Sequence, residues 1–195
     1  MKTIKFSAFF YSLIFILPIY SNAQRVKGSG NVIKETRDIK GFTGLRIRSI
    51  IEVELRQGNF NIEVEAEDNV MEYVETRLIK DKLIVELDDI KLKSEINPKV
   101  YITLPSLIFA EVTDDAKLSS KTVIKTAELR LEANSASESN FILDCKDLRV
   151  DLSGSAKLRI TGFAVKQVIK MQEAASYDAS KLNSENIDIS GAGAS

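Results

Sequence analysis

Four carboxylates recur at nearly regular intervals in the second half of the chain and could together hold a cation. They are Glu111, Glu132, Asp151 and Asp188, with Lys170 at the corresponding place between the last two. Each lies just before the leading apolar residue of a short repeat, so the five side chains are expected to form one column on a solvent-facing strip. Hard cations such as calcium prefer clustered oxygen ligands. The column is therefore either a calcium or cationic-ligand site or a solvated face, and the spacing, which matches no known calcium loop, favours the solvated face.

Two further groups with reactive side chains are better explained as structure. Asp114 and Asp115 are adjacent, and neighbours on a strand point to opposite faces, so the two carboxylates converge only at a turn. Cys145 is the only cysteine, and it alternates with Phe141 and Leu143 on the apolar side of an expected strand. We therefore predict a solvated corner at the two aspartates and a small buried side chain at Cys145.

The composition argues against several classes of chemistry. The chain has no histidine, so it has no histidine-based acid–base catalysis, Ser–His triad or histidine metal site. A formal net charge of −1 and the lack of tryptophan give no basic, aromatic surface for nucleic acid. The glycine-containing strings at 153–155 and 191–193 lack the Gly-Lys-Ser/Thr of a phosphate loop. We predict no catalytic residue, no enzyme activity and no cofactor.

The elements that would position the column are five short repeats. Their leading apolar residues are spaced 21, 19, 19 and 18 positions apart, and they are Val112, Ala133, Leu152, Met171 and Ile189. A period close to 20 is typical of a solenoid, in which each repeat buries its apolar face against its neighbours. Leu148 and Val150 alternate with charged residues, which is the periodicity of a strand. The repeats therefore predict a β-solenoid with repeats of about 19–21 residues.

The part before the repeats is less regular. Residues 24–41 form a polar N-terminal segment with a first strand expected at 31–37, residues 42–105 form irregular rungs, and residues 106–195 hold the short repeats. All of the chain from residue 42 onward is assigned to one domain.

Two local features of the irregular part can be predicted. The alternation from residue 45 to residue 55 is expected to bend near Ser49 and Ile50 into two strands. A short helix is predicted to begin at Asp68 or Asn69 and to end at Arg77, because apolar residues follow at helical spacing.

The first residues have the layout of a secretory signal peptide. Residues 1–5 carry two lysines, residues 6–20 are almost wholly apolar, and Ser21-Asn22-Ala23 is a small-residue cleavage site. The alternative is a membrane anchor, but the apolar run is shorter than the roughly 20 residues that a spanning helix needs. We predict cleavage after Ala23, export to the periplasm, cell surface or extracellular medium, and no stable membrane insertion afterwards.

A set of structural motifs resembles one bacterial family. The motifs are Gly28-Ser29-Gly30-Asn31-Val32, Phe42-x-x-Leu45-x-Ile47, Gln57-Gly58, Ala66-Glu67-Asp68-Asn69, Val74-Glu75-Thr76, Leu83-x-Val85, Val100-x-Ile102-x-Leu104-Pro105, and the Ser-Gly-Ser-Ala and Ser-Gly-Ala-Gly-Ala-Ser strings of the tail. Over residues 28–195 this set resembles the "putative auto-transporter adhesin, head GIN domain" family, a domain of unknown function. The motifs are glycines, turns and core residues, so no catalytic residue is carried over.

The resemblance implies an exported, all-β protein whose domain is a right-handed, single-stranded parallel β-helix. In the second and fourth repeats, residues 134–137 and 172–175 replace the glycine-containing turn, so the turn backbone is expected to differ there. The sequence stops within a repeat, and a terminal rung exposes an edge and apolar core. We therefore expect that the natural domain continues or that copies associate end to end.

The leading functional hypothesis is a non-catalytic module of the cell envelope that binds a surface glycan, a protein or another envelope component. One alternative is a polysaccharide-acting β-helix enzyme, but the short turns of small residues offer no long loops that could build a groove. A structural or signalling envelope protein is the other alternative, and the sequence does not separate it from the first hypothesis.

Overall fold

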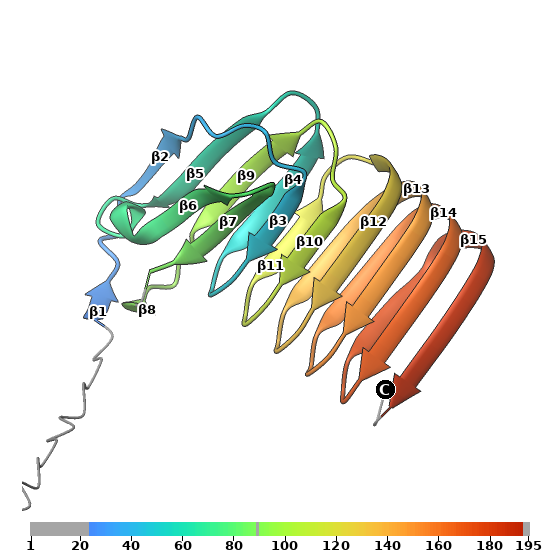
Figure 1. Cartoon of the computed structure of the whole chain (residues 1–195). Helices are drawn as coiled ribbons and strands as arrows, with labels where there is room; N and C mark the ends of the chain where they lie inside the picture. Colours follow the sequence, from blue (N-terminus) through green and yellow to red (C-terminus); the bar gives the residue numbers. More distant parts are fainter. Residues whose placement is uncertain (1–23, 89, 193–195) are drawn as a thin grey trace, which may run out of the picture.

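The computed structural model describes residues 24–88 and 90–192, and Figure 1 shows their arrangement. The predicted signal peptide at 1–23 lies outside the described residues. Within those ranges the chain consists of β-strands and one short 3-10 helix, η1 (Met71–Tyr73). No helix in this part of the chain is long and apolar enough to cross a membrane.

The first part of the chain contains strands β1 to β9. They are β1 (Gln24–Lys27), β2 (Val32–Thr36), β3 (Gly44–Ile47), β4 (Glu52–Gln57), β5 (Asn61–Glu67), β6 (Val74–Ile79), β7 (Lys82–Leu87), β8 (Ile90–Lys93) and β9 (Lys99–Leu104). Several of them, such as β4, β5 and β9, alternate between apolar and polar residues, which places every second side chain on the same face. In β4, for example, Val53 and Leu55 are buried whereas Arg56 is exposed.

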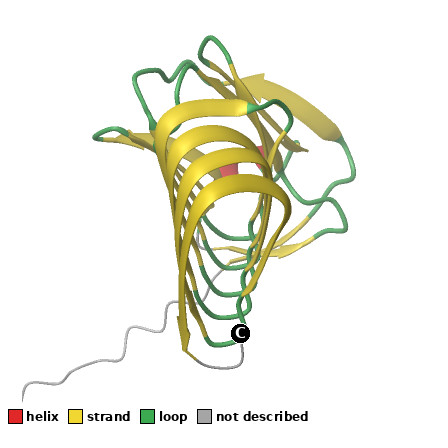
Figure 2. Cartoon of the chain, turned by 90° about the vertical axis from the view of Figure 1, so that its right-hand side faces the viewer, coloured by secondary structure: helices red, strands yellow, loops and turns green. Residues whose placement is uncertain are grey.

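The second part contains two short strands and then four long ones. They are β10 (Phe109–Val112), β11 (Lys117–Ser120), β12 (Ile124–Ala133), β13 (Glu138–Leu152), β14 (Lys157–Gln172) and β15 (Ser176–Ala192). The end view in Figure 2 shows that the long strands arch over the interior instead of running straight. Parallel pairing joins β12 to β13, β13 to β14 and β14 to β15.

The predicted right-handed parallel β-helix is wrong, because the sheet is mixed. Thirteen strands form one curled sheet, a half-barrel, in which β2–β5, β5–β9 and β6–β7 are antiparallel. A separate parallel pair joins β1 to β8. The physical reason is local: a hairpin such as β6–β7 reverses the chain within the two residues Lys80 and Asp81, whereas a parallel pair needs a long connection.

The predicted repeat spacing is correct for three of its four steps. The paired leading residues are Val112 with Ala133, Ala133 with Leu152, and Leu152 with Met171. The last step is wrong, because Met171 pairs with Gly191 and not with Ile189. An irregularity between Arg159 and Thr161 shifts the register of β15 against β14.

The turns that follow β10, β12, β13 and β14 share one backbone conformation. Each contains a residue with positive φ, namely Asp114 (61°), Ser135 (58°), Gly154 (68°) and Glu173 (63°). Backbone hydrogen bonds tie successive turns together, from Ser155 N to Ser135 O at 2.7 Å and from Ala174 N to Gly154 O at 2.9 Å. The expectation of a different backbone at 134–137 and 172–175 is therefore wrong, because stacking on the neighbouring turns holds the same geometry without glycine.

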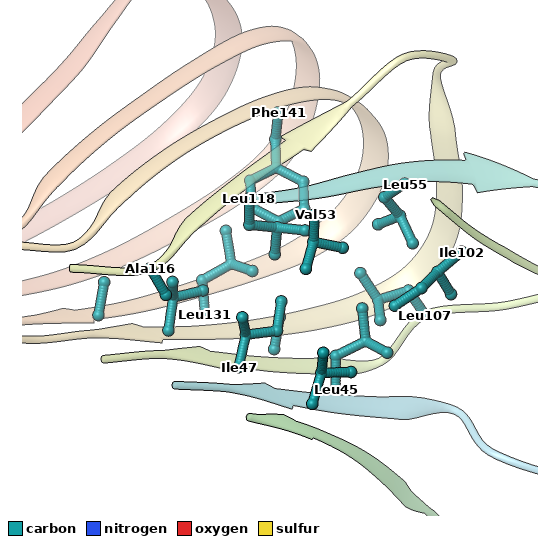
Figure 3. Close-up of a cluster of buried hydrophobic side chains, with 14 of the residues drawn as sticks. Leu45, Ile47, Val53, Leu55, Ile102, Leu107, Ala116, Leu118, Leu131 and Phe141 are labelled. Carbon is teal, nitrogen blue, oxygen red and sulfur yellow. The ribbon is translucent and has the colours of Figure 1, made fainter. Parts of the chain in front are cut away.

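Inward-facing side chains from both parts of the chain form a continuous hydrophobic core. In Figure 3, Leu45 of β3 and Leu55 of β4 lie near Ile102 of β9, and Phe141 of β13 extends the same cluster. These side chains are at most 3% exposed. Burying a side chain of this size contributes roughly 1.5–3 kcal/mol, so the alternation of the sequence is what stabilises the sheet.

Two local predictions have opposite outcomes. The alternation from residue 45 to residue 55 bends as predicted, with β3 ending before Ser49, whose φ is 65°, and β4 following it. The predicted helix ending at Arg77 is wrong: only η1 forms, and the residues after it make β6. Pairing with β7 decides this, because it places Val74 and Thr76 opposite the apolar side chains Leu87 and Val85.

Candidate binding face

The predicted column lies on the outward side of β10, β12, β13 and β14, which we call the ladder face. Three rows of side chains cross these strands in register. The rows are Glu128, Asp147 and Lys166; Phe109, Arg130 and Arg149; and Glu111, Glu132, Asp151 and Lys170. Neighbouring strands lie about 4.8 Å apart, so charges within a row are close enough to interact.

Arginines neutralise the acidic row. Arg46 of β3 places its Nε 2.7 Å from Oε2 of Glu111. Arg130 places its Nε 2.7 Å from Oε1 of Glu132 and its Nη2 3.3 Å from Oδ2 of Asp151. Repulsion among the three carboxylates is thus relieved by cations from β3 and from the adjacent row, as expected for a solvated charged face.

Asp188 does not belong to the acidic row, so that part of the prediction is wrong. In β15 it is Ser190 that pairs with Lys170, whereas Asp188 pairs with Val168. The offset between paired residues of β14 and β15 rises from 19 at Arg159 to 20 from Thr161 onward, whereas Lys170 and Asp188 are only 18 residues apart, so Asp188 lies two positions out of the row. The row therefore ends in a hydroxyl on β15.

The structure offers no ready-made metal site on this face. Among residues 24–88 and 90–192, no group of three or more His, Cys, Asp or Glu side chains is arranged to hold a metal ion. The carboxylates of Glu132 and Asp151 point to Arg130 instead. Calcium binding by the acidic row remains a prediction, and calorimetric titration of the protein with calcium checks it.

Two hollows lie in the ladder face. One, of about 240 Å³, is lined mainly by Arg130, Glu132, Asn134, Asp151, Ser153, Lys170 and Gln172. The other, of about 420 Å³, is lined by Ile108, Phe109, Glu128, Leu129, Arg130, Asp147 and Arg149. Arg130 lines both hollows, and the ring of Phe109 lies 3.8 Å from Nζ of Lys82. The face thus combines charged groups with one aromatic ring.

Three cations of the ladder face are available to a ligand. In the described part of the chain, Arg149, Lys166 and Lys170 have no carboxylate within 4.0 Å. They can donate hydrogen bonds to an anionic or hydroxyl-rich ligand without first breaking an internal ion pair.

The other predicted groups lie where the sequence placed them. Asp114 and Asp115 occupy the turn after β10, and Asp114 Oδ2 accepts a hydrogen bond from Ser49 N at 3.2 Å. Cys145 is buried on the inward side of β13, which confirms that prediction. Burial, with smaller contributions from Asp144 and Asp147, raises the pKa of the Cys145 thiol to about 11. A thiol of this kind is a poor nucleophile.

A buried polar cluster inside the stacked strands escaped the sequence analysis. Gln167 of β14 is 1% exposed, and its Oε1 accepts a hydrogen bond of 2.6 Å from the hydroxyl of Tyr177. Its Nε2 donates to Ser184 Oγ. Burial raises the pKa of Tyr177, with a smaller effect of Cys145. The signal was present, because Gln167 occupies the repeat position that is leucine at Leu148.

Several solved structures share this fold. An adhesin-like protein from Bacteroides fragilis, described as a "putative adhesin", has a TM-score of 0.81 at 17% identity, covering 86% of this chain and 79% of that one. A "putative adhesin" from Parabacteroides merdae has a TM-score of 0.74 at 19% identity, with coverage of 88% and 82%. A "putative lipid binding protein" from Parabacteroides distasonis has a TM-score of 0.72 at 13% identity, with coverage of 87% and 83%.

A comparison with curated proteins found no match. A comparison with family profiles found one that covers most of the chain. The profile described as "Putative auto-transporter adhesin, head GIN domain" matches residues 41–195. This agrees with the motifs quoted from the sequence and with the fold of the solved structures. The chain therefore belongs to the head GIN domain family of auto-transporter adhesin-like proteins.

Proposed function

We propose that this protein is a non-catalytic, exported binding module of the cell envelope that uses the ladder face to bind a surface glycan or protein. The observation that carries the proposal is the set of rows in register, with three unpaired cations beside two hollows. A ligand with repeated polar groups can meet equivalent side chains on successive strands, because the strands have a constant spacing. The adhesin description of the family and of two similar structures supports this kind of role.

The state of the carboxylates supports binding over catalysis. A general acid or base needs a carboxyl group within hydrogen-bond reach of the reacting atoms of the substrate. Glu132 and Asp151 are instead held in ion pairs by Arg130. Neither side chain therefore has the environment of a polysaccharide-cleaving acid, which favours the binding module over the enzyme alternative.

Binding to arrayed bacterial and host polysaccharides and to matrix proteins tests the role of the ladder face. The variant carries Arg149→Gln together with Lys170→Gln, which removes two cations that make no ion pair in the fold. The matched control carries Arg25→Gln and Lys27→Gln, two cations of β1 that make no ion pair among the described residues, so it removes the same charge far from the ladder face. We expect roughly tenfold weaker binding for the first variant, about 1.4 kcal/mol, and an unchanged affinity for the second. Equal affinities for all three proteins would contradict the assignment of the face.

Export is the second part of the proposal. Protease treatment of intact cells, with lysed cells as the control, tells a surface location from an internal one. Digestion on intact cells is the expected result for a surface adhesin. If the protein resists the protease until the cells are lysed, the adhesin role is contradicted, and partners inside the envelope should be sought.

A further inference from the structure

Two strands at the ends of the curled sheet border one hollow, far from the ladder face. Among the described residues β2 pairs only with β5 and β6 pairs only with β7, so each has an unpaired side. Figure 1 shows both strands in the first part of the molecule, away from β12 to β15. A hollow of about 580 Å³ lies between them and also touches η1.

The hollow meets the two strands in different ways. On β2 it is lined by the alternate residues Ile33 and Glu35, followed by Arg37 just after the strand, so β2 presents one face to it. On β6 it is lined by the consecutive residues 74–77, so β6 presents its edge. The hollow thus lies beside the edge of β6 and is covered by the face of β2. An additional strand would fill a space of this shape.

The open edge of β6 carries unpaired backbone groups. The register with β7 and the 2.9 Å hydrogen bond from Asp88 N to Tyr73 O place the bonds to β7 at odd-numbered residues of β6. The N–H and C=O groups of Thr76 and Leu78 therefore point away from β7. A strand edge of this kind is a template for pairing with another chain.

Side chains around this edge define the chemistry of an occupant. Ile33 is 39% exposed and Leu78 is 42% exposed, so apolar contacts are available on both sides. The charged lining residues are Glu35, Asp68, Glu72, Glu75, Arg37 and Arg77, an excess of two acids. Both arginines are already paired with glutamates. Glu72 has no ion-pair partner within the described ranges, so it can accept a cation.

We propose that the edge of β6 accepts an extended segment of a partner protein as an additional strand. The segment would alternate apolar residues with polar ones and carry a lysine or arginine against Glu72. Main-chain hydrogen bonds to Thr76 and Leu78 would provide affinity, and the contacts with Ile33 and Glu72 would provide specificity. The charge complementarity and the unpaired backbone groups favour a basic peptide over an acyl chain. This inference is independent of the function proposed for the ladder face.

Selection from a displayed library of random dodecapeptides on the full chain tests the proposal, followed by anisotropy with each enriched peptide. Thr76→Pro removes an outward N–H that makes no bond to β7, and Thr76→Ala is the matched control that keeps it. Glu72→Lys tests the charge independently of the backbone. We expect enrichment of alternating segments with a basic residue, and roughly tenfold weaker binding, about 1.4 kcal/mol, for Thr76→Pro and for Glu72→Lys. Thr76→Ala should bind as the parent does, and circular dichroism verifies that each variant is folded.

Three results would overturn the proposal. One is a lack of enriched peptides, and another is enrichment of peptides that bind Thr76→Pro as tightly as the parent. The third is a dimer of the parent chain in sedimentation that becomes a monomer in Thr76→Pro, because a second copy would then occupy the edge. In the first of these cases, binding of a fluorescent fatty acid would assign the hollow to a lipid instead.

Discussion

The irregular part of the sheet, β2 to β9, and the stacked part, β12 to β15, bury alternate side chains in the same way but complete the sheet differently. In the irregular part, short strands turn back on each other and several pairs are antiparallel. In the stacked part, each long strand adds in parallel to the one before it. In the irregular part, an inward-facing side chain is covered by strands that approach it from several directions. In the stacked part, it is covered only by the strands next to its own.

The core differs most at the last strand. Large side chains that are at most 1% exposed occur in both parts, for example Leu45, Ile62 and Ile102 in the irregular part and Leu148, Ile160 and Ile169 in the stacked part. The inward side of the stacked part includes the small residues Ala156 and Ala164 and the polar Gln167. In β15, Ile187 and Ile189 are about 60% exposed. Packing should therefore be loosest at β15, and the comparison can be tested there first.

The largest expected effect comes from removing a core leucine of the irregular part. Leu45→Ala should lower the free energy of unfolding by about 2–5 kcal/mol, because Leu45 lies between Leu83 and Ala110 and is fully buried. Leu182→Ala is the matched variant in β15, where the side chain is 9% exposed, and we expect a smaller loss. Urea unfolding of both variants measures the difference. Equal losses would show that β15 is packed as tightly as the irregular part.

The next effect tests close backbone approach in the stacked part. Gly162 has a φ of 112°, and a Cβ there would lie 2.1 Å from the carbonyl oxygen of Leu143. Gly162→Ala should cost about 1–3 kcal/mol from backbone strain and more from the collision. Gly41→Ala is the control in the first part, because its φ is 83° but nothing lies within 4 Å of the added Cβ. Thermal unfolding should show the larger loss for Gly162→Ala, and the reverse order would mean that β13 and β14 separate easily.

A smaller effect is expected from the buried polar cluster. Tyr177→Phe removes the donor to Gln167 Oε1 and should cost about 1–3 kcal/mol, because the oxygen stays buried without a partner. Tyr101→Phe is the control in the irregular part. The Tyr101 hydroxyl donates a hydrogen bond of 3.1 Å to Oε2 of Glu65 at a partly exposed site. Urea midpoints should fall further for Tyr177→Phe. If the urea midpoint of Tyr101→Phe falls by as much, burial is not the reason that the Tyr177 hydrogen bond stabilises the fold.

The smallest effect is a pH dependence at the surface of the stacked part. Hydrogen bonds from the Ser180 side chain and backbone, and then from Arg159, lower the pKa of Asp178 to about 2. A lowered pKa stabilises the fold above the ordinary value of about 4, and this contribution is lost as the pH falls toward 2. The melting temperatures of the parent and Asp178→Asn should therefore differ at pH 6 and converge near pH 2. A constant difference across this range would contradict the role of the charge.

Sequence alone located much of the candidate face. The acidic row is in register as predicted, with Glu111 beside Glu132 and Glu132 beside Asp151. This prediction was possible because the leading apolar residues show the spacing of the repeats that carry the row. The prediction misplaced Asp188, because it took the last repeat as 18 residues whereas β14 and β15 pair at an offset of 20, one residue of which comes from an irregularity in β15. The sequence places Arg130 close enough to relieve repulsion in this row, but its bridging of two carboxylates depends on the distance between neighbouring strands.

The sequence by itself determined which side chains of this protein face inward. Alternation has a period of two along a single strand, so Val53, Leu55 and Cys145 could be assigned to the core without knowing their neighbours. Only the tertiary structure decided the partner and direction of each strand. The pattern of β6 or β9 fits a parallel or an antiparallel neighbour equally well, and contacts between residues far apart in the chain select one of them. That selection made a mixed, curled sheet instead of a parallel β-helix, and it left the edge of β6 open.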